Sequence, residues 1–351
     1  MTPRRLTTLF VAGFLIIVLA IWLSSQRHLE RATNAGELVL PGLEQALNSV
    51  TQLRLTKGDD THTTLKKGAS DWTVDERGYA ADSGKVRKLL LDLAALNVVE
   101  EKTRTPANFP QLGVEDVNSP KATGTKIDAV TPGKSYSLIV GKSSSAKSGY
   151  VRVTGSEQSL LAAPSLAIDA DPKRWLDRSL IDIAQDRVKD FTVKPADGPG
   201  YSAARPSKDQ QDFAVADVPK GRELSNPTAA DPTAGALMAL TLDDAQHAAT
   251  TPPDPKTISH ATFHTFDGLA VDVSGRKDGS RTLISLAASS TDKATESQAQ
   301  GLAARTRGWE FEIPSYKYDS IFRPLEDLLK KLPEPAAKKS AQALPPPKPK
   351  S

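Results

Sequence analysis

Two Gly-Lys-Ser tripeptides are the first candidates for chemistry, because such a tripeptide ends the loop that cradles phosphates in many nucleotide-binding proteins. They are Gly133-Lys134-Ser135 and Gly141-Lys142-Ser143. The full motif needs another glycine five positions before the Gly-Lys pair, where this chain has Asp128 and Tyr136. Both pairs also fall where we expect turns between strands. The sequence therefore argues against a nucleotide site.

Two histidines form the next candidate site. His260 and His264 flank three residues, and on a helix this spacing can place two ligands on one metal ion. The surrounding segment, Ile258 to Val273, instead alternates like a strand, on which the two imidazoles share a face about 13 Å apart. One ion cannot bridge that distance, so we expect histidines that face solvent or pair with neighbours.

Asp169 and Asp171 precede Pro172 and offer two carboxylates for a Ca²⁺ ion. Calcium takes six to eight oxygen ligands, and the sequence has no EF-hand loop to supply the others. We expect a solvated turn at these residues.

Nucleophilic catalysis also lacks a motif. The sequence has no Gly-x-Ser-x-Gly elbow, the turn that exposes the serine of α/β-hydrolases. We therefore predict no catalytic residue, no cofactor and no metal, and a protein that is not an enzyme.

The composition is that of an ordinary globular body. The 351 residues include 45 Lys and Arg and 42 Asp and Glu, which are interspersed and give a net charge of +3. No basic stripe indicates nucleic-acid binding. The absence of cysteine excludes disulfides, thiolate metal sites and cysteine nucleophiles.

Leu6 to Leu23 is an uncharged apolar run of eighteen residues. As a helix it would be about 27 Å long, close to the hydrocarbon thickness of a bilayer. Arg4 and Arg5 precede it, so the N-terminus is expected in the cytoplasm and everything after Ser24 outside. A cleaved signal peptide is the alternative, although its apolar core is shorter and ends in an A-x-A-like site that is absent here.

Hydrophobic patterning divides the chain into six predicted parts. They are a cytoplasmic N-terminus (1–5), a transmembrane anchor (6–23), a stalk (24–36), a first α+β unit (37–186), a second α+β unit with loose insertions (187–332) and a disordered Pro/Lys tail (333–351).

Within the first unit, alternation predicts strands near residues 50–56, 62–67 and 72–74. Asp82 is placed to cap a helix. That helix carries one apolar stripe, formed by Val86, Leu89, Leu90, Leu93 and Leu96. Because such a stripe must be buried, we expect the helix to lie on a sheet.

The second unit repeats this pattern. Residues 188–193 match the first strand, residues 212–215 match the strand at Trp72, and residues 237–245 match the helix more weakly. A third echo pairs residues 309–311 with a helical stripe in residues 318–332, whereas 195–235 and 289–308 look loose. The predicted fold is α+β: an N-terminal transmembrane helix followed by repeated antiparallel β-hairpin, strand and helix units.

Several short phrases have an order and spacing that resemble the bacterial domain-of-unknown-function family numbered 4340, over about residues 40–332. The phrases are Leu40–Leu43, Asp71–Val74, Gly78–Asp82, Leu89-Leu90, Leu93–Leu96, Lys102-Thr103, Thr105-Pro106, Leu112–Glu115, Gly149–Arg152 and Trp175–Arg178. Many members look like single-pass envelope proteins encoded beside ABC-type components that resemble gliding-motility transporters. The family has no established reaction, so the resemblance transfers no catalytic residue.

Four residues in these phrases, Arg152, Trp175, Asp177 and Arg178, are candidates for contact with a partner. The alternative is structural: Trp175 buries its indole between the two halves while Asp177 and Arg178 pair locally.

The expected function is that of an accessory or scaffold protein, anchored by a single pass in a bacterial inner membrane with its body in the periplasm. The resemblance implies subunits of an ABC-type, gliding-motility-like transporter as partners. A module that binds an envelope ligand, glycan or peptide, is the alternative.

Overall fold

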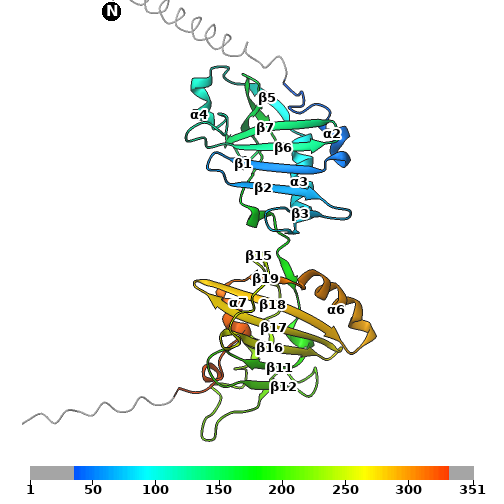
Figure 1. The fold of residues 1–351 in the computed structure, drawn as a ribbon, viewed down its shortest axis with the longest axis vertical. Helices are drawn as coiled ribbons and strands as arrows, with labels where there is room; N and C mark the ends of the chain where they lie inside the picture. Colours follow the sequence, from blue (N-terminus) through cyan, green and yellow to red (C-terminus); the bar gives the residue numbers. More distant parts are fainter. Residues whose placement is uncertain (1–34, 332–351) are drawn as a thin grey trace, which may run out of the picture. The chain divides into compact units, whose positions relative to one another are not determined.

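The computed structural model describes residues 35–331, so the predicted anchor, most of the stalk and the tail lie outside the described residues. No helix within residues 35–331 has the length and apolar character to cross a membrane. The chain forms two compact units, the first ending at Arg178 and the second beginning at Ser179 (Figure 1). Both consist mainly of antiparallel sheet with a few helices, which confirms the α+β class at this level.

The boundary between the units lies eight residues before the predicted one at 186/187. The reason is strand pairing, because β10 (Ser179–Ile181) pairs with β14 (Leu240–Thr241) of the second unit.

The first unit is built on a nine-stranded sheet in the order β4-β3-β2-β1-β6-β7-β8-β9-β5, with every neighbouring pair antiparallel. The strands predicted near residues 50–56, 62–67 and 72–74 are confirmed as β1, β2 and β3. The strand bounds are β1 Gln52–Lys57, β2 His62–Lys67, β3 Trp72–Val74, β4 Tyr79–Ala80, β5 Asn97–Glu101, β6 Thr125–Thr131, β7 Lys134–Ser143, β8 Gly149–Val153 and β9 Ser159–Ala163.

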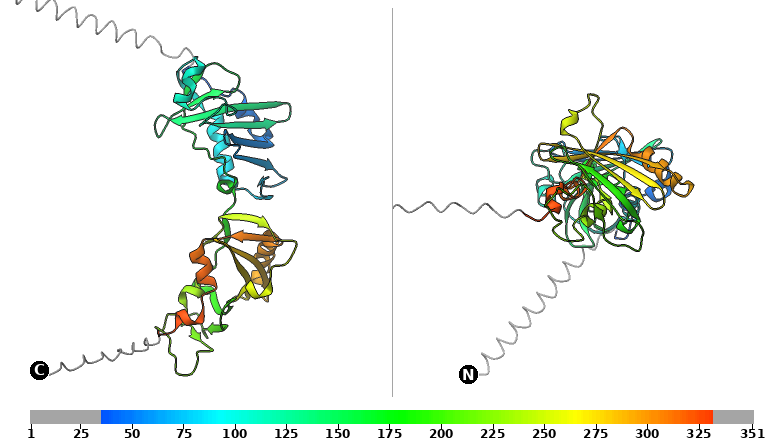
Figure 2. Two further views of the ribbon diagram at one scale, coloured as in Figure 1. Left: turned by 60° about the vertical axis from the view of Figure 1, so that its left-hand side comes forward. Right: turned by 90° about the horizontal axis from the view of Figure 1, so that it is seen from below.

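One long helix, α3 (Ser83–Ala94), lies along a face of this sheet (Figure 2). The predicted cap is confirmed, because the Asp82 carboxylate accepts a hydrogen bond of 3.0 Å from the backbone N–H of Lys85. The apolar stripe is buried, and Leu96 is buried just after the helix ends. The shorter helices are α2 Leu43–Ala46, η1 Leu47–Ser49, η2 Pro106–Asn108, α4 Phe109–Leu112 and η3 Pro172–Trp175.

The second unit has an eight-stranded sheet in the order β13-β12-β11-β16-β17-β18-β19-β15, again antiparallel throughout. Its core centres on Phe191, whose ring lies 5.6 Å from that of Phe213 and 5.9 Å from that of Phe263. The strand bounds are β11 Val188–Lys194, β12 Tyr201–Ala204, β13 Ala214–Val215, β15 Asp244–His247, β16 Ser259–Thr265, β17 Leu269–Asp278, β18 Arg281–Ser290 and β19 Trp309–Glu312.

The helical parts of the second unit are short apart from α6. They are η4 Gln185–Arg187, α5 Asp231–Ala234, η5 Pro255–Thr257, α6 Lys293–Thr306, α7 Ser315–Ile321 and η6 Leu325–Leu328.

Several predictions for the second unit are wrong. Residues 237–245 form β14 and the start of β15, because Ala239 adopts a φ of 46° that stops a right-handed helix. Residues 289–308 contain α6, whose Asp292 carboxylate caps the backbone N–H of Ala294 at 2.9 Å. The stripe in 318–332 is split into α7 and η6 at Pro324. Residues 195–235, predicted to be loose, hold β12 and α5, whereas β13 confirms the strand predicted at residues 212–215.

Candidate functional site

Two family-like phrases lie side by side at the β4 edge of the first sheet. The N–H of Asp177 donates to the carbonyl of Ala80 at 2.9 Å, and the N–H of Asp82 donates to the carbonyl of Trp175 at 2.8 Å. Ala81 and Leu176 form the bridge between these two bonds. Residues 175–177 therefore extend the sheet beyond β4 and meet the chain where α3 begins.

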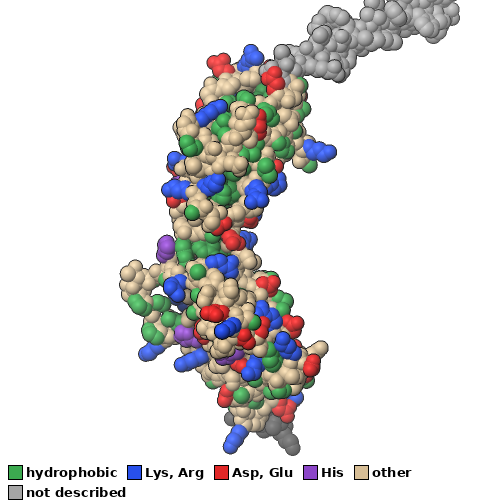
Figure 3. Space-filling view, turned by 90° about the vertical axis from the view of Figure 1, so that its right-hand side faces the viewer, with side chains coloured by type: hydrophobic (Ala, Val, Ile, Leu, Met, Phe, Trp, Pro, Cys, Tyr) green, Lys and Arg blue, Asp and Glu red, His purple; other side chains and the backbone are tan. Residues whose placement is uncertain are grey.

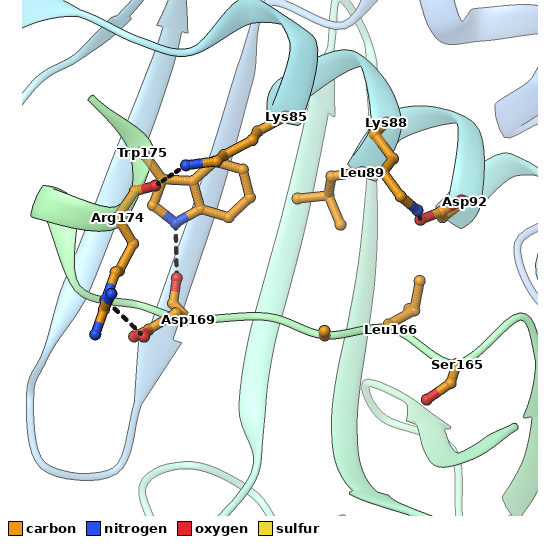
Figure 4. A pocket seen from close by; sticks show the side chains of 10 residues that line it. Lys85, Lys88, Leu89, Asp92, Ser165, Leu166, Asp169, Arg174 and Trp175 are labelled. Carbon is orange, nitrogen blue, oxygen red and sulfur yellow. Dashed lines mark hydrogen bonds and ion pairs between the residues drawn. The ribbon is translucent and has the colours of Figure 1, made fainter. Parts of the chain in front are cut away.

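The Trp175 side chain fixes the turn that precedes it. Its indole is 6% exposed, and Nε1 donates to the carbonyl of Asp169 at 2.7 Å. Lys85 of α3 donates from Nζ to the carbonyl of Arg174 at 3.1 Å (Figure 4). The indole partner and the residues lining the adjacent cavity all belong to the first unit. The Trp175 indole thus closes the turn at 169–175, and the Lys85 side chain joins that turn to the helix.

A cavity of about 410 Å³ lies between α3 and residues 165–175. Leu89 from the helix and Leu166 from the facing segment point into it (Figure 4). Lys88 and Arg174 stand at its rim, with side chains 75% and 69% exposed. The carboxylate of Asp92 is 26% exposed and pairs with Lys88 at 2.6 Å. The site is therefore an apolar groove whose rim presents cations to solvent.

The buried Arg152 lies away from this groove and holds a loop on the sheet. Its Nε donates to the carbonyl of Val114 at 2.7 Å, Nη1 donates to that of Ser156 at 2.9 Å, and Nη2 meets the Asp116 carboxylate at 2.5 Å. A partner would meet the exposed Asp116 rather than the guanidinium, which is buried.

Glycine lets the same loop approach the sheet closely. A Cβ on Gly141 would stand 2.3 Å from the carbonyl oxygen of Leu112, which no side chain can tolerate. Gly141 and Lys142 both belong to β7, so the prediction of a turn there is wrong. Gly133-Lys134 does form the turn between β6 and β7, with Gly133 at a φ of 90°.

The remaining family-phrase candidates lie close to the groove. Asp177 is half-buried and Arg178 is exposed at the end of the first unit, and both make further polar interactions. The expected contact of Arg152, Trp175, Asp177 and Arg178 with a partner stays a prediction.

The two histidines lie on β16 as predicted, and both pair with neighbouring strands. The Nδ1 of His264 lies 2.6 Å from Oδ1 of Asp190, and the Nδ1 of His260 lies 3.2 Å from Oγ of Ser274. Across the part of the chain that the structure describes, no cluster of three or more His, Cys, Asp or Glu side chains is arranged to hold a metal ion.

Asp169 and Asp171 form the expected turn. The carboxylate of Asp169 accepts a bond of 3.0 Å from the N–H of Asp171, whose own carboxylate accepts one of 3.0 Å from the N–H of Lys173 and caps η3. Asp169 also lies 3.9 Å from Nζ of Lys57 and 3.7 Å from Nε of Arg174. These carboxylates are engaged in holding the chain.

The second unit contains a charge cluster that the sequence reasoning missed. Arg276 of β17 makes two parallel hydrogen bonds to Glu310 of β19, at 3.0 and 2.9 Å, and Gln246 donates to the same carboxylate at 3.0 Å. The hydrogen bonds from Arg276 hold the pKa of Glu310 below its ordinary value, and Glu310 in turn raises the pKa of Arg276. The only sequence signal was a charged residue between Trp309 and Phe311 in a strand pattern.

Lys317 is the one lysine in the described residues whose pKa shifts clearly; burial lowers it. Its Nζ donates to the carbonyls of Met238 at 2.6 Å and Ala236 at 3.2 Å. This ammonium therefore ties α7 to the segment after α5.

Charges of both signs are intermixed over the face of the described units that Figure 3 shows. No large area of one sign stands out on that face, in keeping with the nearly balanced composition.

The family model described as Domain of unknown function (DUF4340) matches residues 72–260, just over half of the 351-residue chain. The chain belongs to this family. The match runs from β3 of the first unit to β16 of the second. No curated protein and no solved structure matches the chain.

Proposed function

We propose that this DUF4340 member is a non-enzymatic accessory or scaffold protein of a bacterial inner membrane. Residues 6–23 would anchor it, both α+β units would lie in the periplasm, and its partners would be subunits of an ABC-type, gliding-motility-like transporter. The apolar N-terminal run supports the anchor, and the family resemblance supports the partner.

The observation that carries the proposal is how the polar side chains singled out in the sequence are used. Arg152 holds a loop, Asp171 caps a 3₁₀ helix, and His264 pairs with Asp190 across two strands. Each is engaged in a contact that stabilises the fold. Side chains so engaged favour a protein that works by binding.

Residues 36–43, where the described part of the first unit begins, are bonded to its sheet in a way that suits a protein held by an N-terminal anchor. The N–H of Gly36 donates to the carbonyl of Val98, and the N–H of Val39 donates to that of Leu96, both at 2.8 Å. Leu40 and Leu43 are buried immediately afterwards. The segment that follows the proposed anchor and stalk is therefore fastened to the sheet edge, and a pull on the anchor would reach the sheet.

Co-purification tests this function. The tagged full chain, solubilised from membranes in several gentle detergents, should retrieve an ATPase and a permease subunit of one transporter. A matched control replaces residues 1–27 with a cleavable signal peptide, which releases the body and should reduce the recovery sharply. Recovery of the full chain alone in every detergent would contradict the proposal.

The cavity beside α3 supports a second candidate, a module that binds an envelope glycan or peptide. Titration of the purified full chain with soluble cell-wall fragments would show saturable binding if this second function holds. An unchanged signal across glycan and peptide fragments would exclude it.

A further inference from the structure

We infer that the groove between α3 and residues 165–168, named here the α3 groove, binds an extended acidic peptide segment of the protein's membrane partner. This inference rests on the proposed accessory function and specifies where the partner is held.

The backbone of one groove wall has free hydrogen-bonding capacity. Leu166, Ala167 and Ile168 form neither helix nor strand, and within residues 35–331 their N–H and C=O groups have no hydrogen-bond partner. The chain just beyond is tied down, because the carbonyl of Ala170 accepts from Thr63 at 2.6 Å. An unpaired run of backbone beside a groove is suited to pairing with an added peptide strand.

The interior of the groove suits one apolar side chain. Leu89 and Leu166 face each other across it, and the small side chain of Ala167 is exposed at its wall (Figure 4). A volume of about 410 Å³ holds a few peptide residues rather than a folded domain. We therefore expect a single bulky apolar residue to anchor the segment.

The rim determines the charge of that segment. Asp92 is paired with Lys88, and Asp169 is shared between Lys57 and Arg174. Within residues 35–331 the guanidinium of Arg174 makes no hydrogen bond; its Nε lies 3.7 Å from Asp169, and its side chain is 69% exposed, so it can donate to a bound carboxylate. An outward guanidinium and ammonium favour carboxylates on both sides of the apolar anchor.

Fluorescence anisotropy of the full chain with a labelled, capped peptide, acetyl-Ala-Glu-Leu-Glu-Ala-amide, tests the inference. We expect saturable binding that weakens at least about fivefold as salt is raised to about 0.3 M, because exposed charges are screened. The same peptide with Lys in place of Glu should not bind. No saturable binding of the acidic peptide, or equal binding of the Lys peptide, would overturn the inference.

Substitutions in and beside the α3 groove test whether the acidic peptide binds there. Lys88→Gln with Arg174→Gln should weaken the acidic peptide at least about fivefold through loss of both rim charges. Arg87→Gln is the matched control, since Arg87 is exposed on the same helix outside the groove. Ala167→Phe should block binding by filling the groove, without a change in melting temperature, because Ala167 is exposed. Equal affinity in wild type, the double variant and Ala167→Phe would overturn the site.

The outcomes separate this site from the broader function. Recovery of transporter subunits from membranes together with no peptide binding would reject the α3 groove and leave the accessory role standing. Binding of the acidic peptide without recovery of transporter subunits would reject the transporter as partner and keep the groove.

Discussion

The two units share a strand scaffold but cover it differently. In the first, β2-β1-β6-β7-β8 stand in order, and in the second β12-β11-β16-β17-β18 repeat that order. The first unit inserts α3 between β4 and β5, whereas the second inserts α6 between β18 and β19 and covers much of its sheet with short pieces (Figures 1 and 2). The same strand order is therefore combined with a different helix in each unit; we call α3 and α6 the covers of their sheets.

The covers are stabilised by different forces. The residues that α3 buries are apolar: Val86, Leu89, Leu90, Leu93 and Ala94. Those that α6 buries are half polar: Thr295, Ala299, Leu302 and Thr306. The two threonines also bond to the chain beneath α6, because Thr295 donates to the carbonyl of Asp267 at 3.1 Å and Thr306 donates to that of Leu286 at 3.0 Å. We infer that hydrophobic burial makes α3 a firm wall, beside which a groove can persist.

The largest expected effect is in α3. Leu93→Ala should destabilise the first unit by about 3–4 kcal/mol, because Leu93 is fully buried and its removal leaves a cavity. Leu91→Ala is the control on the same helix, since Leu91 is 53% exposed and should change stability by less than about 0.5 kcal/mol. Hydrogen–deuterium exchange should rise in residues 37–178 only. Equal effects of the two substitutions would break the assignment of the buried face.

Arg152 of the first unit and Arg205 of the second are both buried but have different acceptors. Arg152 donates to two carbonyls and one carboxylate, whereas Arg205 donates to carbonyls only, those of Val188, Gln210, Gln185 and Asp186. Lysine cannot reproduce the planar fork, so Arg152→Lys and Arg205→Lys should each cost about 2–3 kcal/mol.

Arg205→Lys should be the more harmful, because it leaves more carbonyls without a donor. Urea unfolding followed by exchange in each unit measures both losses. A loss below about 0.5 kcal/mol in either variant would contradict the role given to that side chain.

A smaller effect should depend on pH. Because hydrogen bonds from Arg276 lower the folded-state pKa of Glu310, its contribution is fully present above the ordinary value of 4.5 and is lost as the pH falls through the lower folded-state pKa. Glu310→Gln should therefore lower stability at pH 7 by about 1–2 kcal/mol and by progressively less toward pH 3.

Melting curves from pH 7 to pH 3 measure this narrowing. Glu44→Gln is the control for loss of a surface carboxylate, since Glu44 is exposed on α2 of the first unit. A constant gap between wild type and Glu310→Gln over this range would contradict the linkage.

The smallest difference is expected at the helix caps. Asp82→Ala and Asp292→Ala should each cost about 1 kcal/mol, because each removes one carboxylate acceptor from a first turn. Asparagine at either position should recover most of the loss. If one of these substitutions lowered the free energy of unfolding several times more than the other, α3 and α6 would differ in capping as well as in the residues that they bury.

The local sequence pattern predicted the main helix of the first unit but not the helices of the second. The Leu stripe and Asp82 predicted α3 because both signals lie within one helix. Residues 293–306 went unrecognised because Ala, Gln and Thr carry no strong stripe, even though they favour or tolerate a helix. Pro324 lies within the helical Leu spacing of residues 318–332, and a proline at such a place ends the helix despite that spacing.

The candidate site was only half visible in the sequence. Trp175 was singled out, but the groove also needs Lys85 and Leu89 brought from far along the chain. The pair of Arg276 and Glu310 likewise depends on register between distant strands. Such contacts follow from the three-dimensional pairing of strands, which no short window of sequence specifies.

Photo-crosslinking in living cells tests the central claim most directly, that this protein works by holding a membrane transport partner. A photoreactive phenylalanine analogue at position 167, in the α3 groove, should give an adduct with an ATPase or permease subunit of the transporter. The same residue at position 87, outside the groove, should give little. The absence of such an adduct at 167, or equal adducts at both positions, would contradict the account.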